Sequence, residues 1–112
     1  MKIYSLLERY NLHDSLLLGI NYDKNESTLE LVIDFAFWMQ KGYKDDMPET
    51  GVVKLMFSGI NSIELPDNID FNMTSILDVE TNGSTIDIML INDLTDESDD
   101  IKIDANNVEM II

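Results

Sequence analysis

Apolar side chains change their spacing within the first twenty residues, from the period of a helix to the period of a strand. In residues 1–10 they fall three or four positions apart, as on one helical face, at Ile3, Leu6, Leu7 and Tyr10. Asn11 is a suitable residue to end that helix. From residue 15 the period is two, which predicts a strand with one face formed by Leu16, Leu18, Ile20 and Tyr22.

The same alternation predicts strands further along the chain. Residues 28–38 give the clearest one, in which five apolar side chains share a face: Leu29, Leu31, Ile33, Phe35 and Phe37. Gly42 and Pro48 predict a loop over residues 39–50. A strand over residues 51–60 follows, with Phe57 on its apolar face and Gly59 at a bulge or tight bend. Residues 61–65 predict a short strand that ends at Pro66.

Two hairpins are expected in the second half. Asn82-Gly83 lies between two alternating runs, as in a type I′ turn. After an acidic loop, residues 100–112 predict a second hairpin that turns at Asn106-Asn107. The chain is therefore expected to form one domain, residues 1–112, of the α+β class and mainly β, with about seven or eight antiparallel strands and one short N-terminal helix. An antiparallel sheet, a sandwich and a partly open barrel all fit this pattern.

Composition narrows the classes of function. The chain has no cysteine, which excludes disulfides, thiolate zinc sites and cysteine nucleophiles and fits a reducing compartment. It shows no secretory signal and no apolar run that could span a membrane, so we expect a soluble cytoplasmic protein. Glycine-rich phosphate loops are also absent, and no cofactor is expected.

The net charge of −15 is unevenly distributed along the chain. Residues 1–56 hold nine acids and six bases, whereas residues 57–112 hold thirteen acids and Lys102 as the single base. Such an anionic half repels nucleic acid and attracts a basic protein. A basic protein partner is one reading of this charge, and enhanced solubility is the other.

The three adjacent residues His13, Asp14 and Ser15 include the only histidine of the chain and look like hydrolase residues. A catalytic triad needs the imidazole between the hydroxyl and the carboxylate, whereas successive side chains of an extended segment point to opposite faces. No nucleophile-elbow motif supports the serine. We expect a structural role instead, with Asp14 or Ser15 capping local backbone and His13 bonded to a neighbouring strand. No catalytic residue is expected.

Two other groups are candidates for binding. The acidic loop carries Asp93, Asp96, Glu97, Asp99 and Asp100, but as a calcium loop it lacks the required glycine and glutamate, so no metal site is expected. Trp38 falls on the face opposite Phe35, where it either covers a second layer or anchors a partner. Next to it, the 39–50 loop offers further partner-binding candidates: Tyr43, Asp45 and Asp46.

Three short segments resemble a set of small bacterial proteins. These are Leu12-His13-Asp14-Ser15, the strand 29–33, and the segment 53–60 that contains Phe57 and Gly59. Some members of that set are assigned as immunity proteins of polymorphic toxin systems. The resemblance covers roughly residues 3–65 and implies a non-enzymatic cytoplasmic binder that occludes the active site of a toxin, often a basic nuclease.

The sequence therefore favours a protein-binding module over an enzyme. One alternative is a structural or oligomerising domain, because the apolar run 108–112 would form an edge strand able to pair with a second copy. A calcium-binding module is the other alternative.

Overall fold

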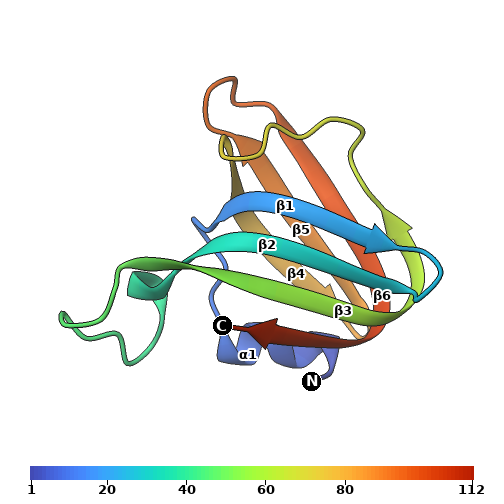
Figure 1. Cartoon of the computed structure of the whole chain (residues 1–112), viewed down its shortest axis with the longest axis horizontal. Helices are drawn as coiled ribbons and strands as arrows, with labels where there is room; N and C mark the ends of the chain where they lie inside the picture. Colours follow the sequence, from blue (N-terminus) through green and yellow to red (C-terminus); the bar gives the residue numbers. More distant parts are fainter.

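The computed structural model describes all 112 residues and shows a closed antiparallel barrel of six strands (Figure 1). The strands follow one another around the barrel in the order β1-β2-β3-β6-β5-β4. Their bounds are β1 (Leu16–Asp23), β2 (Thr28–Ala36), β3 (Thr50–Glu64), β4 (Thr74–Asn82), β5 (Thr85–Asn92) and β6 (Ser98–Ile111). Of the three expected architectures, the barrel is the one formed, and its sheet is closed rather than partly open.

The N-terminal helix is present but short, with a 3-10 turn η1 (Ile3–Ser5) that leads into α1 (Leu6–Arg9). Ile3 and Leu6 are fully buried. The turn η1 packs against β4, β5 and β6, near the β4–β5 turn, and so covers one end of the barrel (Figure 1). No helix of the structure is long and apolar enough to cross a membrane.

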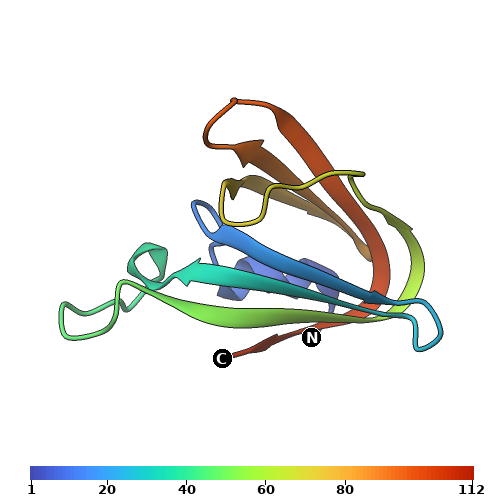
Figure 2. The same cartoon turned by 45° about the horizontal axis from the view of Figure 1, so that its top comes forward.

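The structure has fewer strands than the seven or eight expected, because two predicted breaks lie inside long strands. Gly59 has φ +63°, but the bulge lies two residues further on, at Asn61, where the pairing with β6 shifts between Ile60 and Ser62, and β3 continues to Glu64. The predicted hairpin at Asn106-Asn107 is wrong, since β6 is one strand from Ser98 to Ile111. Gly59 lies opposite Asn106, and a Cβ on Gly59 would come within 2.5 Å of its Nδ2. Both strands curve strongly beside this bulge (Figure 2), which closes the sheet into a barrel.

Two smaller expectations also need correction. In the β4–β5 hairpin, Asn82 pairs with Thr85, so the central turn residues are Gly83 and Ser84. Only Gly83 has positive φ, which makes a type II′ turn rather than the expected type I′. The strand predicted over residues 28–38 is shorter than expected. β2 ends at Ala36, and the next three residues form a second 3-10 turn, η2 (Phe37–Met39).

The core fills the barrel with side chains at alternate strand positions. β2 follows the predicted pattern, with Leu29, Leu31, Ile33 and Phe35 fully buried. Phe57 of β3 is also fully buried. In β1 the predicted face is wrong, because the pairing shifts between Leu17 and Gly19 and the fully buried side chain is Leu17.

The segment His13-Asp14-Ser15 closes the barrel where β1 meets β4. These strands share one paired position, Leu16 opposite Ser75. The Asp14 N–H donates to the Ile76 carbonyl (3.0 Å), and the Ile76 N–H donates to the Ser15 carbonyl (2.8 Å). Asp14 has φ 65°, a conformation that aspartate tolerates better than most residues.

The side chains of this segment strengthen the same seam. The Ser15 hydroxyl is fully buried and accepts a hydrogen bond from the Ala36 N–H of β2 (3.2 Å). The His13 ring donates from Nδ1 to the Leu77 carbonyl of β4. His13 thus has the expected bond to a neighbouring strand, while Ser15 bonds a distant strand rather than local backbone. The serine and histidine engage separate strands and form no triad.

Replacing Ser15 by Ala should lower the free energy of unfolding by about 1–3 kcal/mol, because the buried Ala36 N–H loses its acceptor. His13→Ala should cost less, since the ring is half exposed. Urea unfolding of both variants checks this, with Ser62→Ala as control because that serine is exposed. A Ser15→Ala protein as stable as the control would contradict the structural role.

Candidate functional site

The barrel is open at the end opposite η1, where β4 begins and β5 ends. The inward positions there become polar: Asp99 lies opposite Leu90, and Thr74 lies opposite Asn92. Ile101 and Ile103, which follow Asp99 at alternate positions, are buried. The row of inward side chains therefore ends in a carboxylate at the mouth of the barrel.

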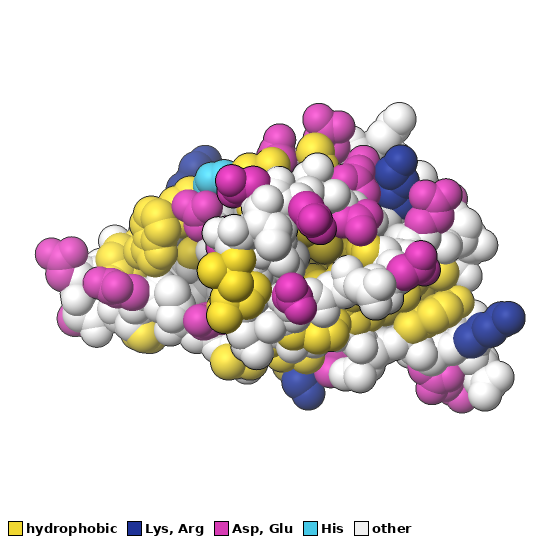
Figure 3. Space-filling view, turned by 90° about the horizontal axis from the view of Figure 1, so that it is seen from above, with side chains coloured by type: hydrophobic (Ala, Val, Ile, Leu, Met, Phe, Trp, Pro, Cys, Tyr) yellow, Lys and Arg dark blue, Asp and Glu magenta, His cyan; other side chains and the backbone are white.

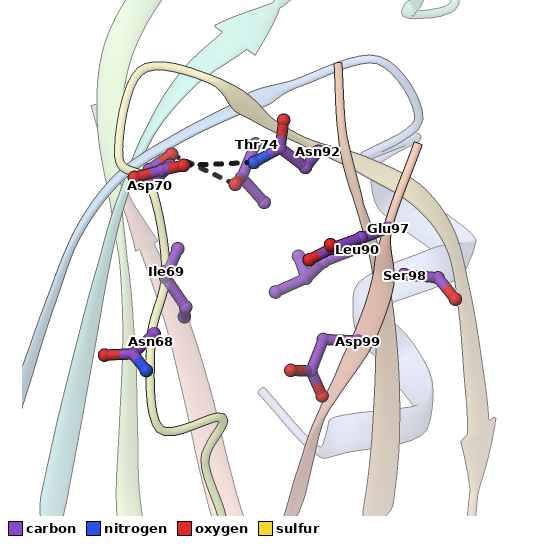
Figure 4. Close-up of a pocket in the computed structure, with 9 residues that line it drawn as sticks. All are labelled: Asn68, Ile69, Asp70, Thr74, Leu90, Asn92, Glu97, Ser98 and Asp99. Atoms are coloured by element: carbon purple, nitrogen blue, oxygen red, sulfur yellow. Dashed lines mark hydrogen bonds between the residues drawn. The ribbon is translucent and has the colours of Figure 1, made fainter. Parts of the chain in front are cut away.

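The chain between β3 and β4, residues 65–73, forms the other wall of this mouth (Figures 1 and 4). The Thr74 hydroxyl donates to the Asp70 carbonyl (3.0 Å), and Asn92 Nδ2 donates to Asp70 Oδ2 (3.2 Å). On its other side the segment reaches β1, where the Asn72 N–H donates to the Leu17 carbonyl (3.3 Å). These bonds hold the segment across the gap that β4 leaves beside β1.

Together these elements enclose a cavity of about 280 Å³, which we call the mouth pocket. Ile69 and Leu90 form its apolar part and face each other across the space in Figure 4. The other lining residues are polar or acidic, and none is basic: Asn68, Asp70, Thr74, Asn92, Glu97, Ser98 and Asp99. The pocket therefore offers hydrogen-bond acceptors to a ligand that brings positive charge.

The β5–β6 loop, which contributes Glu97, is held in shape by one asparagine. Asn92 Oδ1 accepts hydrogen bonds from the N–H groups of Leu94 (2.9 Å) and Thr95 (3.2 Å). The Asn92 N–H donates to the Glu97 carbonyl (2.8 Å), and Asp96 has φ 59°. This turn fixes the loop above the mouth pocket.

The predicted acidic loop divides between several positions. Glu97 and Asp99 line the mouth pocket, whereas Asp100 points to the outer face of β6. Asp93 accepts a hydrogen bond from Ser75 (2.6 Å), and Asp96 is exposed. No three acidic or histidine side chains lie close enough to hold a metal ion, so the geometry gives the calcium alternative no support.

Exposed apolar side chains lie on the two loops that contribute residues to the pocket. Phe71 and Met73 of the 65–73 segment are 39% and 43% exposed, and Leu94 of the β5–β6 loop is 74% exposed. The Asp93 N–H donates to the Met73 carbonyl (2.8 Å), which joins the two loops. We call Phe71, Met73 and Leu94 the apolar rim. Figure 3 looks onto this end and shows acidic side chains spread across it, with the basic ones at its margins.

The other predicted binding residues lie elsewhere. Trp38 is on η2, outside β2, and 48% exposed. Tyr43 donates to the Met47 carbonyl (3.2 Å), and Asp45 and Asp46 are exposed. Their loop projects from the side of the barrel, away from the mouth (Figures 1 and 2). The residues predicted to bind a partner thus lie on two separate surfaces.

Seven of the nine lining residues were not predicted as site residues from the sequence: Asn68, Ile69, Asp70, Thr74, Leu90, Asn92 and Ser98. Asn92 stands at the end of the predicted hairpin, where its place on the inward face follows from the alternation of β5. No sequence pattern indicates that Asp70 lines a pocket, because its hydrogen-bond partners Thr74 and Asn92 come from two other elements.

A second hollow, of about 470 Å³, lies on the outer face of β3, β4, β5 and β6. Directly paired positions place Glu80, Asp87, Lys102 and Glu64 in one row across these four strands. The row holds three acids and the only base of the second half of the chain. This surface is anionic, but Asp87, the acid at its centre, already lies directly opposite Lys102.

Asp87 is the group most disturbed by its surroundings. One of its carboxylate oxygens is buried and has no hydrogen-bond partner. Burial raises the pKa of Asp87 above its ordinary value of 3.8, a hydrogen bond with Asp100 and repulsion from Asp100 and Glu80 raise it further, and Lys102 opposes the rise. The folded chain therefore binds this proton more tightly than the unfolded chain does.

Removing the charge of Asp87 should stabilise the protein at neutral pH. A raised folded-state pKa contributes stability below the ordinary value, and this contribution is lost as pH rises through the folded pKa. Asp87→Asn should therefore melt at a higher temperature than the parent at pH 7, with a smaller gain near pH 3. Thermal unfolding at both pH values checks this, with the exposed Asp45→Asn as control. A lower melting temperature at pH 7 would contradict the assignment.

Comparison with known proteins returned no similar protein of any kind. No protein-family model, curated protein or solved structure matches the chain. The resemblance to immunity proteins drawn from three short segments therefore stays an expectation. What the chain does has to be argued from the mouth pocket, its rim and the charge around them.

Proposed function

We propose that this chain is a non-enzymatic binding module for a basic protein. The observation that carries the proposal is the mouth of the barrel, where a pocket lined by three carboxylates and no base lies beside loops that expose the apolar rim. Protein interfaces combine apolar contacts at their centre with polar groups around them. The mouth provides both at one end of the molecule.

The charge of the chain supports a basic partner over other classes. With a net charge of −15, the protein repels phosphate-rich ligands and other copies of itself at long range. A cationic protein, by contrast, is steered toward it and associates faster at low salt. Homodimerisation through the C-terminal run is less favoured for a second reason: Val108 already exchanges hydrogen bonds with Met1, while β3 pairs the other edge.

In its finer form the proposal makes the partner a toxin, and the chain its cytoplasmic immunity protein. This form rests on the resemblance of the segments 12–15, 29–33 and 53–60 and on the anionic character that suits a basic nuclease. Binding would then block the active site of the toxin, and no chemistry would be required of this chain.

If a neighbouring reading frame encodes a basic protein, the rate at which the two proteins associate should fall about tenfold or more between ~50 mM and ~500 mM salt. The physical reason is screening of the attraction between opposite charges. Stopped-flow mixing of the two purified proteins measures it. Absence of association, or a rate that does not depend on salt, would overturn the proposed function.

A further inference from the structure

The geometry points to the mouth of the barrel as the docking surface, with an arginine of the basic partner in the mouth pocket and apolar neighbours of that arginine on the rim. This inference rests on the proposed function and names the surface and the side chain that it uses. The competing surface is the 39–50 loop with Trp38, the other binding candidate from the sequence.

The spacing of the acceptors selects an arginine over a metal ion. A metal ion needs several ligand atoms converging on one point, and the acids here do not converge. A guanidinium instead presents five N–H donors in a planar fork, which reach acceptors that stand apart. The carboxylates of Asp99 and Glu97 offer such separated acceptors at the cavity (Figure 4).

The size and floor of the pocket suit one long side chain. Its volume of about 280 Å³ lies just below the roughly 300–1,000 Å³ of pockets that hold drug-sized ligands. The apolar stem of an arginine would lie along Ile69 and Leu90, with its charged head toward Asp99. A phosphate or carboxylate ligand is excluded, because no base lines the cavity.

The rim explains why the ligand is part of a protein rather than a free cation. Leu94 is 74% exposed, and Phe71 and Met73 lie on the segment that it meets through Asp93. Apolar side chains exposed together beside a pocket are typical of a protein-docking surface. A small polyamine would fill the pocket but leave this rim in water.

The test is a titration of the ¹⁵N-labelled protein with the acetylated, amidated tripeptide Leu-Arg-Leu, followed by amide chemical shifts. We expect shifts at Phe71, Met73, Leu94 and Asp99 and none at Trp38. A tripeptide with citrulline in place of arginine keeps the shape but loses the charge and should bind about tenfold more weakly. The lysine tripeptide should also bind more weakly, since it lacks the fork.

Matched variants separate the mouth from the rest of the anionic surface. Asp99→Asn should weaken binding of the arginine peptide about tenfold, and Leu94→Ser should weaken it about fivefold. Asp45→Asn and Trp38→Ser, on the competing surface, should leave the affinity for the arginine peptide unchanged. All four positions are exposed, so the variants should fold, and their amide spectra show whether they do.

Three results would overturn the inference: no shifts at the mouth with millimolar peptide, equal binding of the citrulline peptide, or shifts centred on residues 38–47. None of these results bears on the salt-dependent association of the protein with its whole partner. If that association persists while the peptide test fails, the protein binds a basic partner through another surface. If the association itself is absent, the proposed function fails.

Discussion

β1 and β4 share one paired position, Leu16 opposite Ser75, and this short seam determines the shape of the functional end. Every other neighbouring pair of strands is joined by a run of paired positions. Because β4 leaves β1 so early, its own pairing cannot cover the lumen. The 65–73 segment has to cross the gap, and its bonds to Leu17 and Asn92 turn that gap into the mouth pocket.

The seam also explains why a row of reactive residue types stands at the start of β1. A junction with one paired position needs additional hydrogen bonds, and His13, Asp14 and Ser15 supply them to β4 and β2. The same polarity that suggested chemistry is therefore used to satisfy backbone groups at the point of closure. Geometry, rather than residue type, separates the two interpretations.

The sequence predicted those features that depend on local pattern. The alternation of β2, the position of the helix and the positive φ of Gly59 follow from a few neighbouring residues. The prediction failed where a local signal has a partner far along the chain. Gly59 was expected at a bulge or tight bend and Asn106 at a hairpin turn, but they lie opposite each other in one β3–β6 pairing, and neither strand ends there.

In the candidate site, too, some residues could be placed from local pattern and others could not. Asp99 shares the alternation of Ile101 and Ile103, so its inward position could be read from the sequence. Asp70 could not be placed, because its hydrogen bonds to Thr74 and Asn92 depend on the tertiary fold.

The anionic charge serves different purposes at the two hollows. On the outer face, Lys102 stands between Asp87 and Glu64, so part of the charge is balanced within the protein. At the mouth, Glu97 and Asp99 have no base beside them, and like charges at an opening cost stability that solubility alone does not require. Charges scattered over the surface would keep the protein soluble at lower cost. The proposed basic partner would cover both these acids and the exposed Leu94.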